Sequence, residues 1–133
     1  MWLVAWLLPA LRWLFPGHQV LAVAALVAGL LISAAGVVQF RQARTTVNPM
    51  TPDASSSLVV AGIYRWTRNP MYLGFLVALI GIASWLASPA ALLVLPFFVL
   101  YMNRFQIVPE ERALAARFGA SFEQYRRSVR RWL

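Results

Sequence analysis

A stretch of polar and aromatic side chains at residues 62–74 has the composition of a binding site. It holds two arginines, two tyrosines, a tryptophan and an Asn-Pro step, where a polar segment meets a long apolar run. Asn69 is a good N-cap, and Pro70 suits the first helical position because its missing N–H is not needed there. We therefore expect a helix to begin here, with free N–H groups and a positive dipole end beside Arg68. Such a helix start favours a carboxylate or another anion.

A second candidate group is the acidic pair Glu110 and Glu111, which follows Pro109. Proline at a first helical position with acids just after it is also ordinary helix-start chemistry, so these glutamates have a purely structural explanation. The stretch at 62–74 has one as well, since membrane helices commonly carry arginines and aromatic residues at the interface. The residues alone leave both alternatives open.

The composition indicates the class of protein that must position these groups. Of 133 residues, 61% are hydrophobic and only 12% are charged, whereas a soluble domain has about a quarter charged residues. The sequence predicts an integral membrane protein with a single small domain. Its net charge of +8 comes from arginine, which in a membrane protein indicates topology and attraction to anionic lipid rather than nucleic acid. With no cysteine and one histidine, we expect no metal site.

Apolar segments predict an all-α membrane bundle of about four transmembrane segments. Residues 2–15 form a short first segment, which we expect to be a tilted membrane helix or one that begins upstream of Met1. Residues 20–40 are free of charge and have small residues on one face, which suits close helix packing. Residues 71–87 and 90–103, joined at Ser88-Pro89, predict a helical hairpin.

The arginines predict the orientation. They flank the loop at residues 45–57 and follow the last apolar segment, while the turns at 16–19 and Ser88-Pro89 have none. By the positive-inside rule, we expect the loop at 45–68 and the C-terminal segment to be cytoplasmic, in a bacterial inner membrane. In the C-terminal segment, apolar residues at spacings of three and four predict one face of an amphipathic helix, bent at Gly119. These residues are Leu114, Phe118, Phe122, Tyr125, Val129 and Trp132.

We thus expect one domain, residues 1–133, in four parts. These are the first two membrane helices at 1–44, the cytoplasmic loop at 45–68, the hairpin at 69–108 and the cytoplasmic helix at 109–133.

Four short motifs, in order, carry a resemblance to a known family. They are Leu58-Val59-x-x-Gly62-x-Tyr64, Arg68-Asn69-Pro70-Met71-Tyr72-x-Gly74, Pro109-Glu110-Glu111 and a C-terminal pattern that runs from Phe118-Gly119 to Tyr125, Val129 and Arg131-Trp132. Together they resemble the isoprenylcysteine carboxyl methyltransferases and their bacterial relatives, which overlap with the phospholipid methyltransferase group. The resemblance covers about two thirds of the chain.

The resemblance implies a membrane methyltransferase that uses S-adenosylmethionine and acts on a lipophilic small molecule or a lipid at the cytoplasmic face. Matching positions imply a cofactor pocket, to which the anion argument adds Arg68. The expected cofactor-binding residues are Leu58, Val59, Gly62, Tyr64, Arg68, Asn69, Pro70, Tyr72, Glu110 and Glu111. The helix start suits the cofactor's carboxylate, either glutamate suits its ammonium group, and Tyr64, Trp66 or Tyr72 suits its adenine or sulfonium.

Two positions depart from the family pattern. Asn69 stands where members often have histidine, and since an amide cannot titrate, acid–base catalysis there is not expected. Gln106 stands where the carboxyl methyltransferases have an arginine implicated with the substrate, so Arg104 is a candidate for orienting the acceptor. We assign no catalytic acid or base, because methyl transfer depends mainly on alignment. The acceptor and the oligomeric state stay open.

Two other functional classes remain. One is a membrane reductase similar to the sterol reductases, which share a comparable Arg-x-Pro-x-Tyr stretch but use NADPH. The other is a non-enzymatic membrane protein whose arginine- and aromatic-rich stretch only anchors it at the interface.

Overall fold

The computed structural model describes residues 1–9, 14–43 and 57–133, and within these ranges all regular structure is helical. The expected all-α class is therefore confirmed for the described part of the chain. The elements are α1 (Trp2–Leu7), α2 (His18–Gln42), η3 (Gly62–Arg65), α3 (Pro70–Trp85), α4 (Pro89–Leu92), α5 (Val94–Met102), η4 (Asn103–Ile107), α6 (Val108–Phe118) and α7 (Ala120–Ser128).

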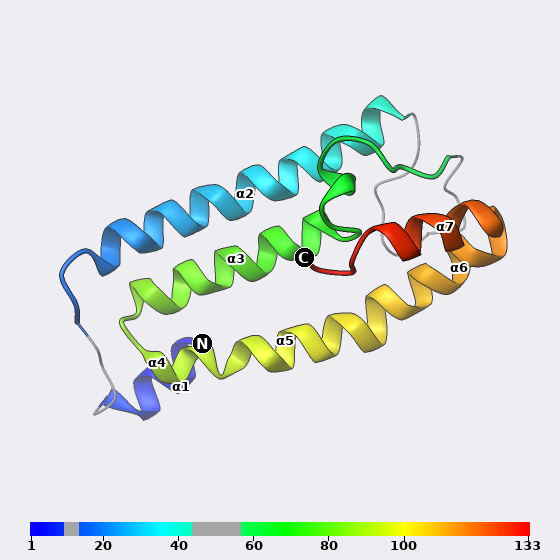
Figure 1. Cartoon of the computed structure of the whole chain (residues 1–133). Helices are drawn as coiled ribbons and strands as arrows, with labels where there is room; N and C mark the ends of the chain where they lie inside the picture. Colours follow the sequence, from blue (N-terminus) through cyan, green and yellow to red (C-terminus); the bar gives the residue numbers. More distant parts are fainter. Residues whose placement is uncertain (10–13, 44–56) are drawn as a thin grey trace.

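Three long helical segments lie side by side and alternate in direction (Figure 1). Helix α3 is in the middle, with α2 packed on one side and α5 on the other. Helix α1 contacts α4 at one end of this bundle. The end of α2, the start of α3 and helices α6 and α7 gather at the opposite end (Figure 1).

Helices α2 and α3 approach closely because glycines line their contact. A Cβ atom added at Gly29 would lie 2.5 Å from the carbonyl oxygen of Gly74, and one added at Gly81 would lie 2.9 Å from the carbonyl oxygen of Ala22. The hydroxyl of Ser33 donates a hydrogen bond to the carbonyl of Met71 across the same contact. The small-residue face expected on residues 20–40 thus packs against a helix of its own chain.

Two helices of the described part are long and apolar enough to cross a membrane. They are α2, with 25 residues, and the continuous helix Pro89–Phe118, with 30 residues. Helix α3 is apolar but has 16 residues. Helix α1 ends at Leu7 after six residues, so the spanning helix expected at 2–15 is not confirmed, and residues 10–13 of that segment lie outside the described residues.

The chain reverses between α3 and α4, so that α5 runs back along α3. Ala87 has a positive φ of 46° in this turn, and Pro89 begins α4. Leu93 interrupts the helix between α4 and α5. Pro96, three residues later, has no N–H to donate to the carbonyl of Leu92, which explains why the regular α-helical bonding is broken here.

The acidic pair does not follow a helix start, in contrast to the expectation that a helix begins at Pro109. The helix continues from α5 through η4, a π-helical turn, into α6. The N–H of Val108 donates to the carbonyl of Asn103, five residues back, and this wider turn accommodates the proline. A free helix end therefore cannot explain Glu110 and Glu111.

The C-terminal segment is helical only in part. Gly119, with φ of 52°, separates α6 from α7, which agrees with the expected bend. Helix α7 ends at Ser128, and Val129 is extended with φ of −127° and ψ of 132°. The expectation that Val129 and Trp132 continue one helical face was wrong. The N–H of Val129 still donates to the carbonyl of Tyr125, but the carbonyls of Arg130 and Arg131 accept hydrogen bonds from Arg68 and Asn69 at the start of α3.

The two arginine-free turns lie together at the α1 end of the bundle. His18, the first residue of α2, has its Nδ1 atom 3.2 Å from the carbonyl oxygen of Ser84, near the end of α3. The loop expected at 45–57 lies outside the described residues except for Ser57, whose hydroxyl donates to the carbonyl of Ala43.

Candidate functional site

The segment before α3 is held against α7 by a small apolar core. Val59 and Tyr64 pack there with Phe122 and Tyr125, and all four side chains are buried. The phenol of Tyr125 donates a 2.8 Å hydrogen bond to the backbone carbonyl of Tyr64. Burial raises the pKa of both phenols above the ordinary tyrosine value, so both stay protonated at neutral pH. This contact fixes η3 relative to the C-terminal helices.

We expect Tyr125→Phe to destabilise the protein by about 1–3 kcal/mol, because it leaves the buried carbonyl of Tyr64 without its donor. Thermal unfolding in detergent measures the change. Ser128→Ala is the matched control, since it also removes one side-chain-to-backbone bond, but from an exposed residue at the end of α7. Equal effects of the two substitutions would contradict this role of Tyr125.

Asn69 occupies the N-cap position of α3, as expected, but its side chain does not cap the helix. Its Nδ2 group donates instead to the carbonyl of Arg131, at 2.9 Å. The hydroxyl of Thr67 donates to the same carbonyl and also accepts the N–H of Asn69. The side-chain amide of Asn69, which was expected to cap α3, therefore binds the backbone near the C-terminus.

Residues 129–133, which we call the C-terminal strap, run back to the start of α3 (Figure 1). The carbonyl of Arg130 accepts the N–H of Arg68. The indole of Trp132 donates to the Oδ1 atom of Asn103 at 3.1 Å and packs against the buried cluster of Tyr72, Met102 and Ile107. The strap thus joins the segment before α3 to the helix that carries the acidic pair.

The first turn of α3 and the acidic pair meet in space. The phenol of Tyr72 donates a 2.7 Å hydrogen bond to the Oε1 atom of Glu110, across 38 residues of sequence. Tyr72 is buried, and Glu110 is partly exposed. A carboxylate with one hydroxyl donor keeps the capacity to accept further hydrogen bonds.

Glu111 lies between two arginines. Arg131 donates to it from both Nε and Nη2, at 3.0 and 2.6 Å, which is the bidentate arrangement that orients a carboxylate strongly. The Nη1 atom of Arg68 lies 2.9 Å from the Oε1 atom of Glu111. Two guanidinium groups and two carboxyl groups therefore lie around the start of α3.

Arg68 is the least satisfied member of this group. Its side chain is 11% exposed, and within the described residues neither its Nε nor its Nη1 atom makes a hydrogen bond of acceptable geometry. Burial lowers the pKa of this guanidinium below its ordinary value, and the Glu111 carboxylate opposes the shift. The Nη1 atom has the Glu111 carboxylate beside it, but a buried donor without an acceptor, such as Nε, is costly, so an anionic ligand at Arg68 would be favoured.

The other predicted site residues lie nearby but in a different environment. Val59 and Tyr64 belong to the apolar core already described, and Leu58 packs against it. Gly62 has φ of 59°, a backbone conformation that L side chains rarely adopt, so the conformation favours glycine; the nearest atoms to an added Cβ belong to the end of the Gln39 side chain, which can move. Their role toward a cofactor stays a prediction, as does that of Pro70, the buried first residue of α3.

Arg104, the candidate for orienting the acceptor, lies in the π-helical turn. It is exposed and makes no hydrogen bond or ion pair with the part of the chain that the structure describes. Its neighbour Asn103 is the one that contacts the strap. The structure therefore does not bring Arg104 into the group around Tyr72.

Sequence reasoning assigned no role to Arg131 or Trp132, although both belong to the C-terminal motif. The predicted helix placed Trp132 on its apolar face and Arg131 among the arginines of the remaining surface, so neither was expected to contact the segment before α3. The spacing of the motif was the only signal that could have singled them out.

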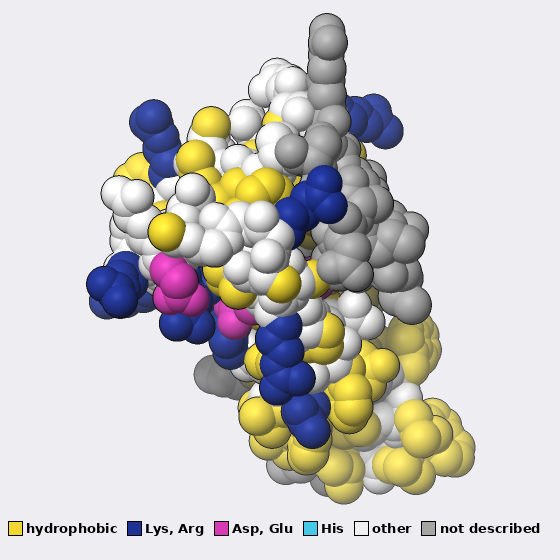
Figure 2. All heavy atoms as spheres, turned by 90° about the vertical axis from the view of Figure 1, so that its right-hand side faces the viewer, with side chains coloured by type: hydrophobic (Ala, Val, Ile, Leu, Met, Phe, Trp, Pro, Cys, Tyr) yellow, Lys and Arg dark blue, Asp and Glu magenta, His cyan; other side chains and the backbone are white. Residues whose placement is uncertain are grey.

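Arginines also mark the surface at this end of the molecule. Figure 2 shows basic side chains spread over it, with acidic atoms beside some of them. The exposed arginines include Arg65, Arg104, Arg112, Arg117, Arg126, Arg127 and Arg130. Such a surface fits the headgroup region of an anionic membrane.

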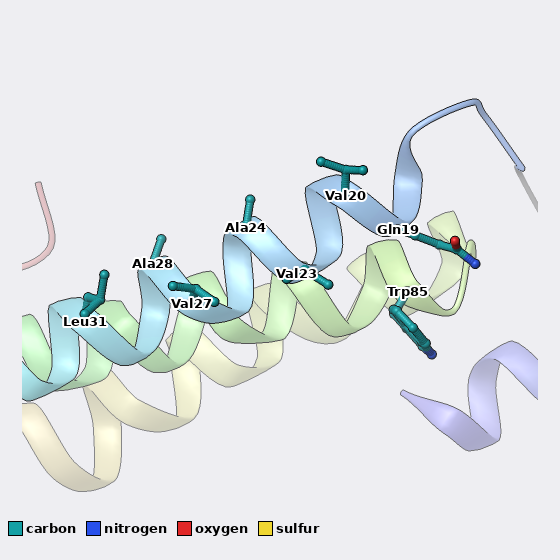
Figure 3. Close-up of a pocket in the computed structure, with 8 residues that line it drawn as sticks. All are labelled: Gln19, Val20, Val23, Ala24, Val27, Ala28, Leu31 and Trp85. Atoms are coloured by element: carbon teal, nitrogen blue, oxygen red, sulfur yellow. The ribbon is translucent and has the colours of Figure 1, made fainter.

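A shallow apolar hollow lies elsewhere, along one face of α2 and against Trp85 at the end of α3 (Figure 3). Its lining is Gln19, Val20, Val23, Ala24, Val27, Ala28, Leu31 and Trp85, and it has no ionisable group. It suits hydrocarbon and offers nothing to a zwitterionic ligand. None of the predicted site residues line it.

The chain is similar in sequence to known methyltransferases. A family model described as phospholipid methyltransferase matches residues 18–121. A Schizosaccharomyces pombe protein named protein-S-isoprenylcysteine O-methyltransferase is 28% identical over 119 residues, which cover 90% of this chain and 50% of that protein. The Saccharomyces cerevisiae protein of the same name is 35% identical over 72 residues, or 54% of this chain and 30% of that protein.

A shorter relative comes from Haemophilus influenzae. This protein, named only as uncharacterized, is 41% identical over 63 residues, which cover 47% of this chain and 100% of that protein. The chain thus spans about half the length of the Schizosaccharomyces pombe enzyme and a smaller share of the Saccharomyces cerevisiae one. No solved structure matches the chain significantly.

Proposed function

This chain belongs to the phospholipid methyltransferase family, and we propose that it transfers a methyl group from S-adenosylmethionine to a lipophilic acceptor at one face of a membrane. One observation carries the proposal. The Tyr72–Glu110 hydrogen bond and the group of Arg68, Glu111 and Arg131 bring opposite charges together at the start of α3.

The charges of this group match those of the cofactor. The unsatisfied donors of the Arg68 guanidinium suit the cofactor's carboxylate. Between the two glutamates, Glu110 is the better partner for the ammonium group, because Glu111 is already bonded to two arginines. Tyr72 and the exposed Trp66 are the aromatic candidates for the sulfonium or the adenine.

When bound, the cofactor supplies an activated methyl group on its sulfonium. The protein's task is then alignment, and holding two reactants in near-attack geometry can lower a barrier by roughly 7–11 kcal/mol at best. No titrating group is needed for this, which agrees with an asparagine at position 69. Burial of Tyr72 excludes water from one side of the group. A dry site favours a reaction in which an anionic acceptor meets a cationic donor.

The acceptor is proposed to be lipophilic, a lipid or a lipid-like small molecule. The names of the two yeast relatives refer to isoprenylcysteine, which is a lipidated substrate. The helices α2 and α5 expose large apolar side chains that suit contact with hydrocarbon, and the acceptor is proposed to approach from that side. Arg104 remains the candidate for orienting an acidic acceptor from the π-helical turn.

For the topology, we propose that α2, α3 and the helix from Pro89 cross the membrane, as one domain over residues 1–133. The 30-residue helix is about 45 Å long, more than the hydrocarbon thickness of about 30 Å, so α6 would extend beyond the bilayer. Its arginines, with those of α7, would then lie at the cytoplasmic face of a bacterial inner membrane. A fourth crossing by residues 2–15 stays a prediction.

Ligand binding in detergent tests the proposed function. We expect S-adenosylhomocysteine to raise the melting temperature and NADPH to leave it unchanged, since a 2′-phosphate needs a further arginine cluster and the two arginines that the described residues place in this group already contact Glu111. Incubation with labelled S-adenosylmethionine and a lipid extract should then label a lipid. A shift with NADPH alone would identify a reductase, and no shift with either ligand would favour a non-enzymatic protein.

A further inference from the structure

The C-terminal strap contacts both halves of the proposed site at once. Its backbone carbonyls accept the N–H of Arg68 and the side-chain amide of Asn69. Its side chains bond to Glu111 and to Asn103, which lie on the helix from Pro89. The family match ends at residue 121, so the strap lies beyond it.

We propose that Arg131 is a positioning residue for cofactor binding, acting through Glu111 on Arg68. The inference rests on the proposed function and deepens it, since it names the residue that orients the carboxylate-binding guanidinium. Arg131 does not itself touch the ligand in this proposal. The strap's other contacts hold Arg131 in place.

The geometry gives the direction of the effect. Arg131 donates hydrogen bonds to both oxygens of Glu111, which fixes the plane of that carboxylate. Glu111 in turn lies 2.9 Å from one guanidinium nitrogen of Arg68 and holds it by charge. That nitrogen is Nη1, while the Nε donor of Arg68 has no hydrogen bond in the described part of the chain and lacks an acceptor that a ligand carboxylate could supply.

The alternative is that the strap only stabilises the fold. Trp132 supports this alternative, because it packs against buried Tyr72, Met102 and Ile107. Arg131 differs, since its side chain is 34% exposed and its hydrogen bonds go to one carboxylate of the site. A purely structural role and a positioning role therefore predict different results for Arg131.

The experiment compares single and double variants of the full chain in detergent. We expect Arg131→Ala to weaken S-adenosylhomocysteine binding by about tenfold or more and to raise KM for S-adenosylmethionine, with a smaller change in kcat. Arg131→Lys should not restore binding, because a lysine lacks the planar fork of donors that forms two parallel hydrogen bonds with Glu111. Arg127→Ala, an exposed arginine on α7, is the matched control and should bind as the unmodified protein does.

A double-mutant cycle separates the two roles. If Arg131 acts through Glu111, Arg131→Ala should add nothing to the binding defect of Glu111→Gln. Additive defects, full rescue by Arg131→Lys, or unchanged binding in Arg131→Ala would each overturn the inference. Absence of binding by the unmodified protein would instead refute the proposed function, so the two failures are distinguishable.

Discussion

Glu110→Gln is expected to weaken S-adenosylhomocysteine binding by about 30-fold or more. The substitution keeps an oxygen that accepts the Tyr72 hydrogen bond but removes the charge that we propose for the cofactor's ammonium group. Loss of one partner from a desolvated, hydrogen-bonded charge pair costs about 2–5 kcal/mol, and 2 kcal/mol corresponds to about 30-fold in affinity. Calorimetric titration in detergent measures the change, with initial methyl-transfer rates as a second readout.

Glu123→Gln is the matched control for this prediction. Glu123 pairs with Arg126 one turn away on α7, with 40% and 50% of the two side chains exposed. Such surface pairs contribute little, so this variant should bind normally. If Glu110→Gln bound as tightly as Glu123→Gln, the ammonium would have to be recognised elsewhere, and the proposed site would be wrong.

Gly74→Val is expected to abolish stable folding, the largest effect of any single substitution that we propose. A side chain at Gly74 would collide with the backbone carbonyl of Gly29 and with Ser33. Two of the three nearest atoms belong to the backbone of α2, so the helices could only move apart. Overpacking costs about 1–3 kcal/mol when neighbours can yield, and more is expected where they cannot.

Size-exclusion profiles and thermal unfolding in detergent measure this effect. Phe75→Leu provides the control, because this neighbouring residue is 51% exposed and is not among the atoms of the close contact at Gly74. We expect that variant to be folded and to bind ligand normally. A monodisperse, cooperatively melting Gly74→Val protein would show that the α2–α3 contact is looser than the structure has it.

The sequence by itself determined the class of the protein and the order of its long helices. Hydrophobic runs, prolines and glycines are local signals, and local signals predict where helices start and turn. They correctly predicted the reversal at Ser88-Pro89, the helix start at Pro70 and the break at Gly119. They left residues 2–15 a prediction, since the described helix ends at Leu7 and residues 10–13 lie outside the described part of the chain. They failed at Pro109, where a π-helical turn lets the helix continue.

The membership in a methyltransferase family was also accessible from the sequence, because short motifs survive as residue types in fixed order. The motifs could not tell which of their members touch one another. Residues 62–74 and the acidic pair are separated by a helical hairpin, so their contact depends on how α5 returns along α3.

Only the tertiary structure decided which partners each of the two glutamates contacts and which segments the C-terminal strap joins. Asn69 was expected to cap α3 and instead binds the carbonyl of Arg131, because a hydrogen-bond acceptor from the end of the chain lies within reach. Glu110 and Glu111 are adjacent in sequence but point to different partners, Tyr72 and the arginine pair. Partner choice depends on distances between segments far apart in the chain, and no local pattern of residues contains those distances.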